Sequence, residues 1–201
     1  CLRLEISPST QTKGKELSTF INYSRRREDA PISYANFDTT NIPYYTKKDS
    51  YFIFKFLNGQ ADYIHPLSEN GKLETGLKSN ARFINGELKY TYLDNLSGLW
   101  LPTAGKDNDA DYTDVISAAY VTYSNKYKDF SYEAGLRSEH TYLDFSIMSG
   151  TQKYNRDYID LFPSLSLTQS IGKENQIQLS YSRRINRPGL YSLNPFVEQF
   201  D

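Results

Sequence analysis

Apolar and polar residues alternate strictly in short segments along most of this chain. The clearest case is the segment 176–182, in which Ile177, Leu179 and Tyr181 stand between glutamines and serines. The same pattern recurs in segments 2–7, 17–24, 57–63, 73–78, 119–124, 130–139 and 164–168. Because successive side chains of a strand point to opposite faces, a period of two predicts strands with one apolar and one polar face. The sequence therefore predicts an all-β fold of about eight strands.

The connections between these segments alternate in length. Short segments typical of turns lie at Thr10–Lys15, Ser68–Lys72, Asn125–Lys128 and Ser170–Glu174. Long polar stretches, which we expect to be loops, lie at Glu28–Ser50, Gly86–Tyr112 and Ser146–Asp157. This alternation predicts antiparallel strands in up-and-down order, with turns at one end of the sheet and long loops at the other.

The composition excludes several other classes of protein. Lys and Arg number 23 and Asp and Glu number 24, and the net charge of −1 does not provide the basic surface of a typical nucleic-acid-binding protein. No apolar run approaches the roughly 20 residues of a membrane-spanning helix. Aromatic residues reach 15%, which is too many for a disordered chain, and the aliphatic content is too low for a helical bundle.

Short turns at one end, long loops at the other and strands with one apolar face are typical of outer-membrane β-barrels. In lipid every backbone group must be hydrogen-bonded, so only a closed sheet can cross the membrane. The aromatic residues near predicted strand ends suit the girdles at the membrane interfaces, namely Tyr63, Tyr123, Tyr127, Phe130 and Tyr132. The difference between the two ends favours a membrane barrel over a soluble sandwich or lipocalin-like barrel, whose strands also alternate.

An ordered set of motifs in the second half resembles the barrel domain of TonB-dependent outer-membrane receptors, in particular the type common in Bacteroidetes. The motifs are Ala118-Ala119-Tyr120-Val121-Thr122-Tyr123, Tyr132-Glu133-Ala134-Gly135-Leu136-Arg137-Ser138-Glu139 closing on Thr141, Asn155-Arg156-Asp157-Tyr158 leading to Leu161-Phe162-Pro163-Ser164, Leu179 to Pro188, and Leu193-Asn194-Pro195-Phe196. The resemblance implies antiparallel strands that form part of a transmembrane barrel in the bacterial outer membrane.

The resemblance also implies TonB-dependent uptake of a scarce ligand, such as a siderophore, cobalamin, a glycan or a peptide. It implies a plug domain, a TonB complex that acts through parts not in this chain, and a surface lipoprotein as a further partner. Because plugged barrels have about 22 strands, we expect residues 1–201 to be one partial barrel domain. A passive porin-like or structural barrel is the main alternative, and a soluble secreted glycan-binding domain is a third. No cofactor and no enzymatic chemistry are expected.

Two sets of residues are candidates for ligand contact. Tyr90, Tyr92 and Trp100 lie in a predicted long loop, as does the pair Tyr44-Tyr45, and exposed rings of this kind stack on sugars or siderophores. A second set lies on the predicted polar face and would line the lumen or contact a plug: Glu133, Arg137, Glu139 and Arg184. The alternative role of both sets is structural, within loops or lumen networks.

Clusters of charge suggest two further contacts. The arginines Arg25, Arg26, Arg27 and Arg187 are expected at the outward ends of strands, where guanidinium groups suit lipopolysaccharide phosphates. Their alternative role is pairing with lumen carboxylates such as Glu139. Asp107, Asp109 and Asp111 alternate as at the start of an EF-hand loop, but Tyr112 replaces the turn glycine. We therefore expect a solvated acidic stretch there, with a weak Ca²⁺ site as the alternative.

Overall fold

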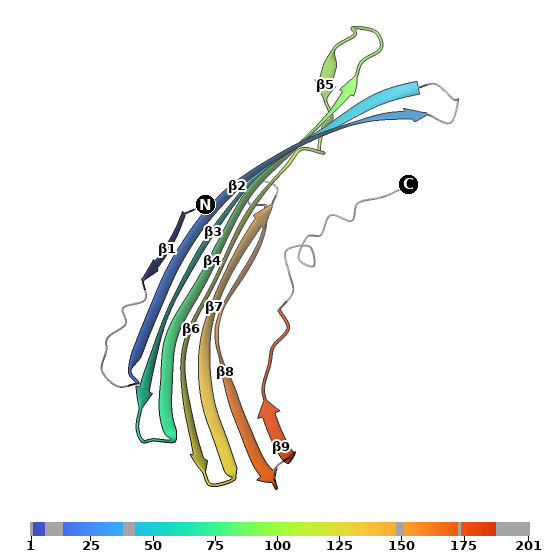
Figure 1. The fold of residues 1–201 in the computed structure, drawn as a ribbon. Helices are drawn as coiled ribbons and strands as arrows, with labels where there is room; N and C mark the ends of the chain where they lie inside the picture. Colours follow the sequence, from blue (N-terminus) through green and yellow to red (C-terminus); the bar gives the residue numbers. More distant parts are fainter. Residues whose placement is uncertain (1, 7–13, 38–42, 148–150, 173, 188–201) are drawn as a thin grey trace.

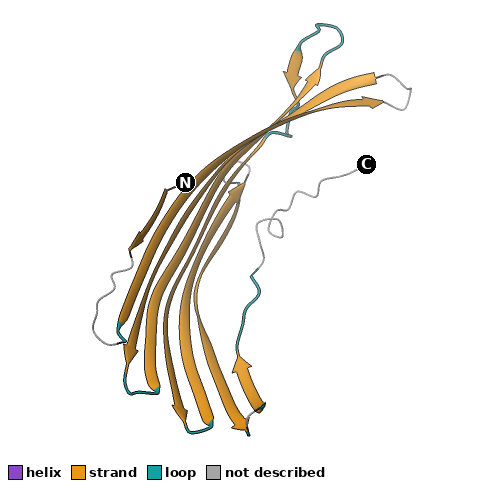
Figure 2. Cartoon of the chain, viewed as in Figure 1, coloured by secondary structure: helices purple, strands orange, loops and turns teal. Residues whose placement is uncertain are grey.

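The computed structural model describes residues 2–6, 14–37, 43–147, 151–172 and 174–187. These residues form one curved antiparallel sheet (Figures 1 and 2). Its strands are β1 (Leu2–Ile6), β2 (Glu16–Phe37), β3 (Pro43–Pro66), β4 (Gly71–Leu93), β5 (Trp100–Pro102), β6 (Asn108–Tyr127), β7 (Phe130–Ile147), β8 (Gln152–Ile171) and β9 (Asn175–Ser182). In the part of the chain described, no helix is long and apolar enough to cross a membrane.

The strands follow one another across the sheet in chain order. The order is β1-β2-β3-β4-β6-β7-β8-β9, and the short β5 pairs with the outward end of β4. Every pairing is antiparallel. The predicted all-β, up-and-down architecture is therefore confirmed, and the sheet is open, with β1 and β9 at its two edges (Figure 1).

The register divides the side chains between two faces. Cross-strand partners share a face, so the pairs Ile21↔Gly59 and Ala61↔Leu77 extend into one continuous surface that also carries Leu179. We call this surface the outer face, and the opposite one the inner face. Ile21, Leu77 and Leu179 are 54%, 63% and 68% exposed, as expected for side chains whose solvent is lipid.

Aromatic side chains gather on the outer face at the end of the sheet that carries the short turns. The ring of Tyr132 lies 5.8 Å from Tyr123 and 6.1 Å from Phe130, and Tyr63 lies 5.9 Å from the ring of His65. Rings in this position match the girdle at the inward membrane interface.

The three long stretches predicted as loops are largely strand, and that prediction was wrong. β2 and β3 remain paired as far as Phe37↔Pro43, β4 and β6 as far as Leu88↔Asn108, and β7 and β8 as far as Ile147↔Gln152. Membrane crossing needs only about 9–11 residues of strand, so these strands continue beyond the lipid. There the outer face meets water instead of lipid, and the alternation of hydropathy disappears although the hydrogen-bonded ladder continues.

An apolar cluster covers the inner face in the outward half of the sheet. Ile84, Tyr112, Phe145 and Ile147 are buried there, and Phe52, Phe54, Ala110 and Leu143 pack against them. The ring of Phe52 lies directly over Gly86, where a Cβ would overlap it. This cluster joins β3, β4, β6 and β7 above the level of the lipid and supports the hairpins beyond it.

Candidate ligand site on the outward hairpins

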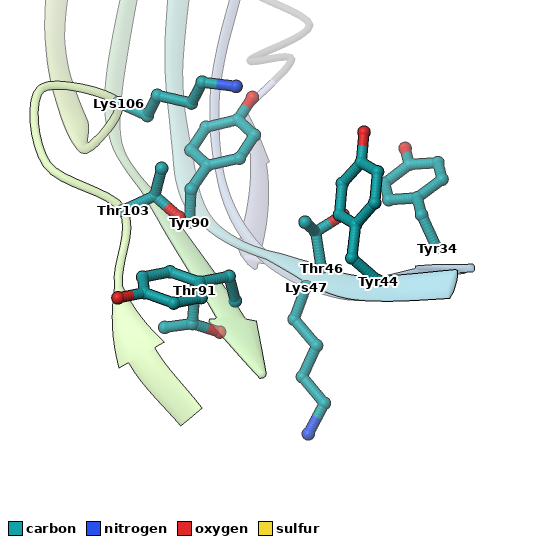
Figure 3. Close-up of a pocket in the computed structure, with 9 residues that line it drawn as sticks. Tyr34, Tyr44, Thr46, Lys47, Tyr90, Thr91, Thr103 and Lys106 are labelled. Atoms are coloured by element: carbon teal, nitrogen blue, oxygen red, sulfur yellow. The ribbon is translucent and has the colours of Figure 1, made fainter. Parts of the chain in front are cut away.

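A pocket of about 360 Å³ lies between the outward ends of β2, β3 and β4 and the stretch that follows β5 (Figure 3). Its lining consists of aromatic, hydroxyl and ammonium groups from Tyr34, Tyr44, Thr46, Lys47, Tyr90, Thr91, Tyr92, Thr103 and Lys106. In Figure 3 Tyr34, Tyr44 and Tyr90 stand on one side of the strands, and Lys47 extends to the other. A volume of this size is in the range of small-molecule sites.

Cross-strand register brings the tyrosines together. Tyr34 of β2 is opposite Thr46 of β3, and Thr46 is opposite Tyr92 of β4. Tyr44 and Tyr90 lie two residues away on the same inner face of β3 and β4. Two segments distant in the sequence therefore present a continuous row of rings and hydroxyls.

Backbone hydrogen bonds fix the stretch after β5 against Tyr90. The Thr103 amide donates to the Tyr90 carbonyl at 2.7 Å, and the Tyr90 amide donates to Asp107 Oδ1 at 2.8 Å. Thr103 and Lys106 are thereby held at the pocket. Asp107 serves here as an acceptor for the backbone.

Trp100 lies beside the pocket and not in its lining. The ammonium of Lys47 lies 3.8 Å from the centroid of the Trp100 ring, a cation–π contact between β3 and β5. Trp100, Tyr90 and Tyr92 were expected in a loop, but all three belong to strands. Strand positions are more rigid than loop positions, so the rings are preorganised.

The turn between β4 and β5 is closed by Asp94. The Ser97 amide and hydroxyl donate to Asp94 Oδ2 at 2.9 and 2.5 Å, and the Gly98 amide donates to the Asp94 carbonyl at 2.8 Å. The hydrogen bonds from the Ser97 hydroxyl and amide lower the pKa of the Asp94 carboxyl. The ionised carboxylate thus holds the hairpin that carries Trp100.

A second group of predicted residues lies mainly on the inner face of β7. Glu139 is 8% exposed, with Oε1 2.6 Å from Arg137 Nε and Oε2 2.7 Å from Arg187 Nη2. Arg183 Nη2 lies 3.1 Å from Asp160 Oδ1. Both carboxylates are thus neutralised within the sheet, and Arg187 and Arg183 fasten the segment after β9 to the inner face.

The other two residues of this predicted set are more open. Glu133 is exposed on the inner face of β7, and Arg184 is exposed in the segment after β9. The set as a whole does not meet the tyrosine pocket. Glu139 lies in the same cross-strand row as Lys78 of β4. Tyr90 is 12 positions further along β4 than Lys78, which is about 40 Å along a strand.

The strand register places the residues of the predicted basic cluster on different faces of the sheet, and it places two residues of the predicted acidic cluster within a strand. Arg187 lies inward against Glu139, as in the alternative role, and not on an outward surface. Arg25 and Arg27 are on the outer face and Arg26 is on the inner face, all within β2 and not at its end. Asp109 and Asp111 belong to β6, and Asn85 Nδ2 donates to Asp111 at 2.5 Å. Among the residues described, no three metal-binding side chains gather.

Tyr34, Thr46 and Lys106 belong to the pocket but were not predicted. The signal for Tyr34 and Thr46 was the spacing of two between Tyr34 and Asn36 and between Tyr44 and Thr46, whereas Lys106 had no such signal. That spacing is informative only if β2 and β3 are known to continue beyond the lipid. Asn36 Nδ2 donates to Thr46 Oγ1 at 3.1 Å, which ties the two strands there.

Comparison with known proteins gives a family and a fold. A model of the outer membrane protein beta-barrel family matches residues 9–201. Among solved structures, the crystal structure of the ferric citrate transporter FecA in the unliganded form is similar, with a TM-score of 0.54 over 88% of this chain at 12% identity. The chain spans 25% of that transporter chain, and the likeness concerns the fold alone. None of the curated protein sequences matches.

Proposed function

The chain belongs to the outer membrane protein beta-barrel family, and from this we propose that it forms barrel wall and ligand vestibule of a TonB-dependent receptor. Its place in the bacterial outer membrane follows from the family and the fold, and excludes the soluble glycan-binding domain. The observation that carries the proposal is the tyrosine pocket on hairpins that project beyond the lipid-facing strands.

The chemistry of the pocket supports a hydroxyl-rich or anionic ligand. Its lining includes four tyrosines, three threonines and two lysines, and none of its lining residues is an Asp or Glu. Tyrosine rings provide flat amphipathic surfaces, and the hydroxyl groups and the Lys106 ammonium donate hydrogen bonds, whereas the Lys47 ammonium lies over Trp100. Among the ligand classes considered, a glycan or a carboxylate-bearing siderophore fits this lining better than a cationic peptide.

The transport cycle in this proposal involves parts outside the residues described. The ligand binds at the outward hairpins, a surface lipoprotein assists its delivery, and an energised TonB complex displaces a plug from the lumen. The charged inner face around Arg137 and Glu139 would then border the route of the ligand. This chain contributes binding and lining, and we assign no bond-making step to it.

Uptake by whole cells tests the proposal. Cells that express the complete protein are given four labelled probes: cyanocobalamin, an iron-loaded carboxylate siderophore, an oligosaccharide mixture and a peptide digest. We expect saturable uptake of one probe class that stops when a protonophore dissipates the inner-membrane gradient. Uptake that is linear with concentration and insensitive to the protonophore would instead support a passive porin-like barrel.

Substitution in the pocket separates ligand binding from barrel assembly. The double variant Tyr90→Ala/Tyr92→Ala should bind the transported probe about tenfold more weakly, because two stacking surfaces are lost. Tyr127→Ala is the matched control, since Tyr127 is 70% exposed at the opposite end of the sheet. Equal effects of the two changes would contradict a ligand site at the hairpins.

A further inference from the structure

Two cations lie directly opposite each other on the outer face. Arg25 of β2 and Lys55 of β3 are cross-strand partners. Like charges in this arrangement repel and destabilise a sheet unless an anion lies between them. Arg25 is exposed and Lys55 is half-buried, so an anion could reach both from the side of the membrane.

The sheet itself supplies no such anion among the residues described. The outer-face neighbours of Arg25 and Lys55 are Tyr23, Arg27, Ile53, Leu57 and Phe83, and none of them is acidic. The other arginines of the run are already paired. Arg27 Nε lies 2.9 Å from Asp29 Oδ2 and its guanidinium covers the Tyr51 ring, while Arg26 pairs with Glu28 on the inner face.

The two cations lie at a defined height in the membrane. His65, in the aromatic girdle at the short turns, and Lys55 are ten positions apart on β3, about 33 Å along a strand. A strand tilt of roughly 35–45° reduces this to about 23–27 Å, which matches the roughly 25 Å apolar band of an outer-membrane barrel. Arg25 and Lys55 therefore lie where the apolar band ends on the outward side.

We propose that Arg25 and Lys55 form a binding site for a phosphate group of lipopolysaccharide in the outer leaflet. The planar guanidinium donates two parallel hydrogen bonds to phosphate oxygens, and the ammonium supplies a second charge. Tyr23 and Leu57, one step toward the lipid on the same face, lie beside the acyl chains. The site is independent of the tyrosine pocket and of the transport activity.

Binding of purified lipopolysaccharide to the complete protein in detergent tests the site. The double variant Arg25→Gln/Lys55→Gln should bind about tenfold more weakly than the parent, and dephosphorylated lipopolysaccharide should bind both proteins equally weakly. The control Arg26→Gln/Lys78→Gln removes the same charge from the inner face and should leave binding unchanged. Heat-modifiable migration in gels verifies that each variant is folded.

A charge-preserving exchange makes the test independent of folding defects. Arg25→Lys/Lys55→Arg should retain binding of lipopolysaccharide, because both charges remain on the outer face. Unchanged binding by the double glutamine variant would overturn the proposal, as would an equal loss in the inner-face control. The proposal would also be overturned if the parent protein bound phosphorylated and dephosphorylated lipopolysaccharide with equal affinity. The same holds if it bound phosphatidylglycerol micelles as tightly as phosphorylated lipopolysaccharide.

Discussion

Neighbouring residues on one strand of this sheet meet different solvents. On β9, Leu179 is 68% exposed on the outer face opposite Leu167, whereas Gln178 turns inward and donates to Ser166 Oγ at 3.1 Å. Lipid cannot hydrate a charge, but the polar inner face can. The cost of a charged side chain therefore changes sharply within one residue.

Leu179→Arg should impair assembly of the protein in the membrane, because the guanidinium would face the lipid; such a substitution costs roughly 2–4 kcal/mol at the middle of the bilayer and less toward the interfaces. Gln178→Arg places the same side chain on the inner face and should be tolerated much better. The fraction of heat-modifiable protein in outer membranes measures both effects. Similar losses in the two variants would show that the faces are assigned wrongly.

The hairpin of β4 and β5 shows how a single carboxylate organises an element outside the membrane. The Asp94 amide donates to the Leu99 carbonyl at 2.8 Å, and Gly98 adopts a φ of +70° that closes the turn. The Ser97 amide and hydroxyl bind the carboxylate. Because this hairpin carries Trp100 and leads into Thr103 and Lys106, its stability determines the order of one side of the pocket.

Acidification should loosen this hairpin. The folded turn lowers the pKa of Asp94, so its stabilisation is complete above the ordinary Asp pKa of about 3.9 and is lost as the pH falls through the lower folded value. Exchange of the Ser97 amide, corrected for intrinsic rates, should be unchanged near neutral pH and accelerate as the pH falls below about 4. Asp94→Asn removes the titrating group and should abolish this dependence. A pH response that persists in the variant would contradict the assignment.

The whole sheet is a segment of a wall with two edges. β1 pairs with Thr19–Tyr23 of β2, and β9 pairs with Ser164–Ile171 of β8. Among the described residues, the remainder of β2 and of β8 each has one strand neighbour. Unpaired backbone groups are costly in lipid, so we infer that further strands complete the barrel, in line with the larger transporter whose fold this chain matches in part.

The assembled protein should therefore migrate as a heat-modifiable outer-membrane band well above the 23.2 kDa of this chain. An antibody raised against residues 86–112, which include the β4–β5 hairpin, identifies that band in fractionated envelopes. The unheated sample should migrate differently from the heated one, because closed barrels resist detergent unfolding at room temperature. A soluble band near the mass of the chain would contradict membrane closure.

Where the two faces of a strand meet different solvents, the pattern of residues was sufficient to predict the structure. Alternation identified the lipid-level strands and the faces of Leu179 and Gln178, and glycine-containing turns located the inward ends at Gly71 and Gly172. Apolar and polar residues alternate because one face of the strand meets lipid and the other meets water, so the alternation is pronounced only within the membrane. Beyond the lipid the outer face meets water and the inner face carries an apolar cluster, so the pattern is lost and the outward parts of β2, β3 and β4 were not predicted.

The pairing register between strands determined which distant residues become neighbours. Residues 34, 46 and 92 form one row only because β2, β3 and β4 pair as they do. For the same reason Arg25 meets Lys55, while Arg187 reaches Glu139 through the path of the chain after β9. Such neighbours are set by hydrogen-bond ladders between distant segments and not by local preference. The sequence identified several of the residues involved, but only the tertiary structure determined which of them lie together in the two candidate binding sites.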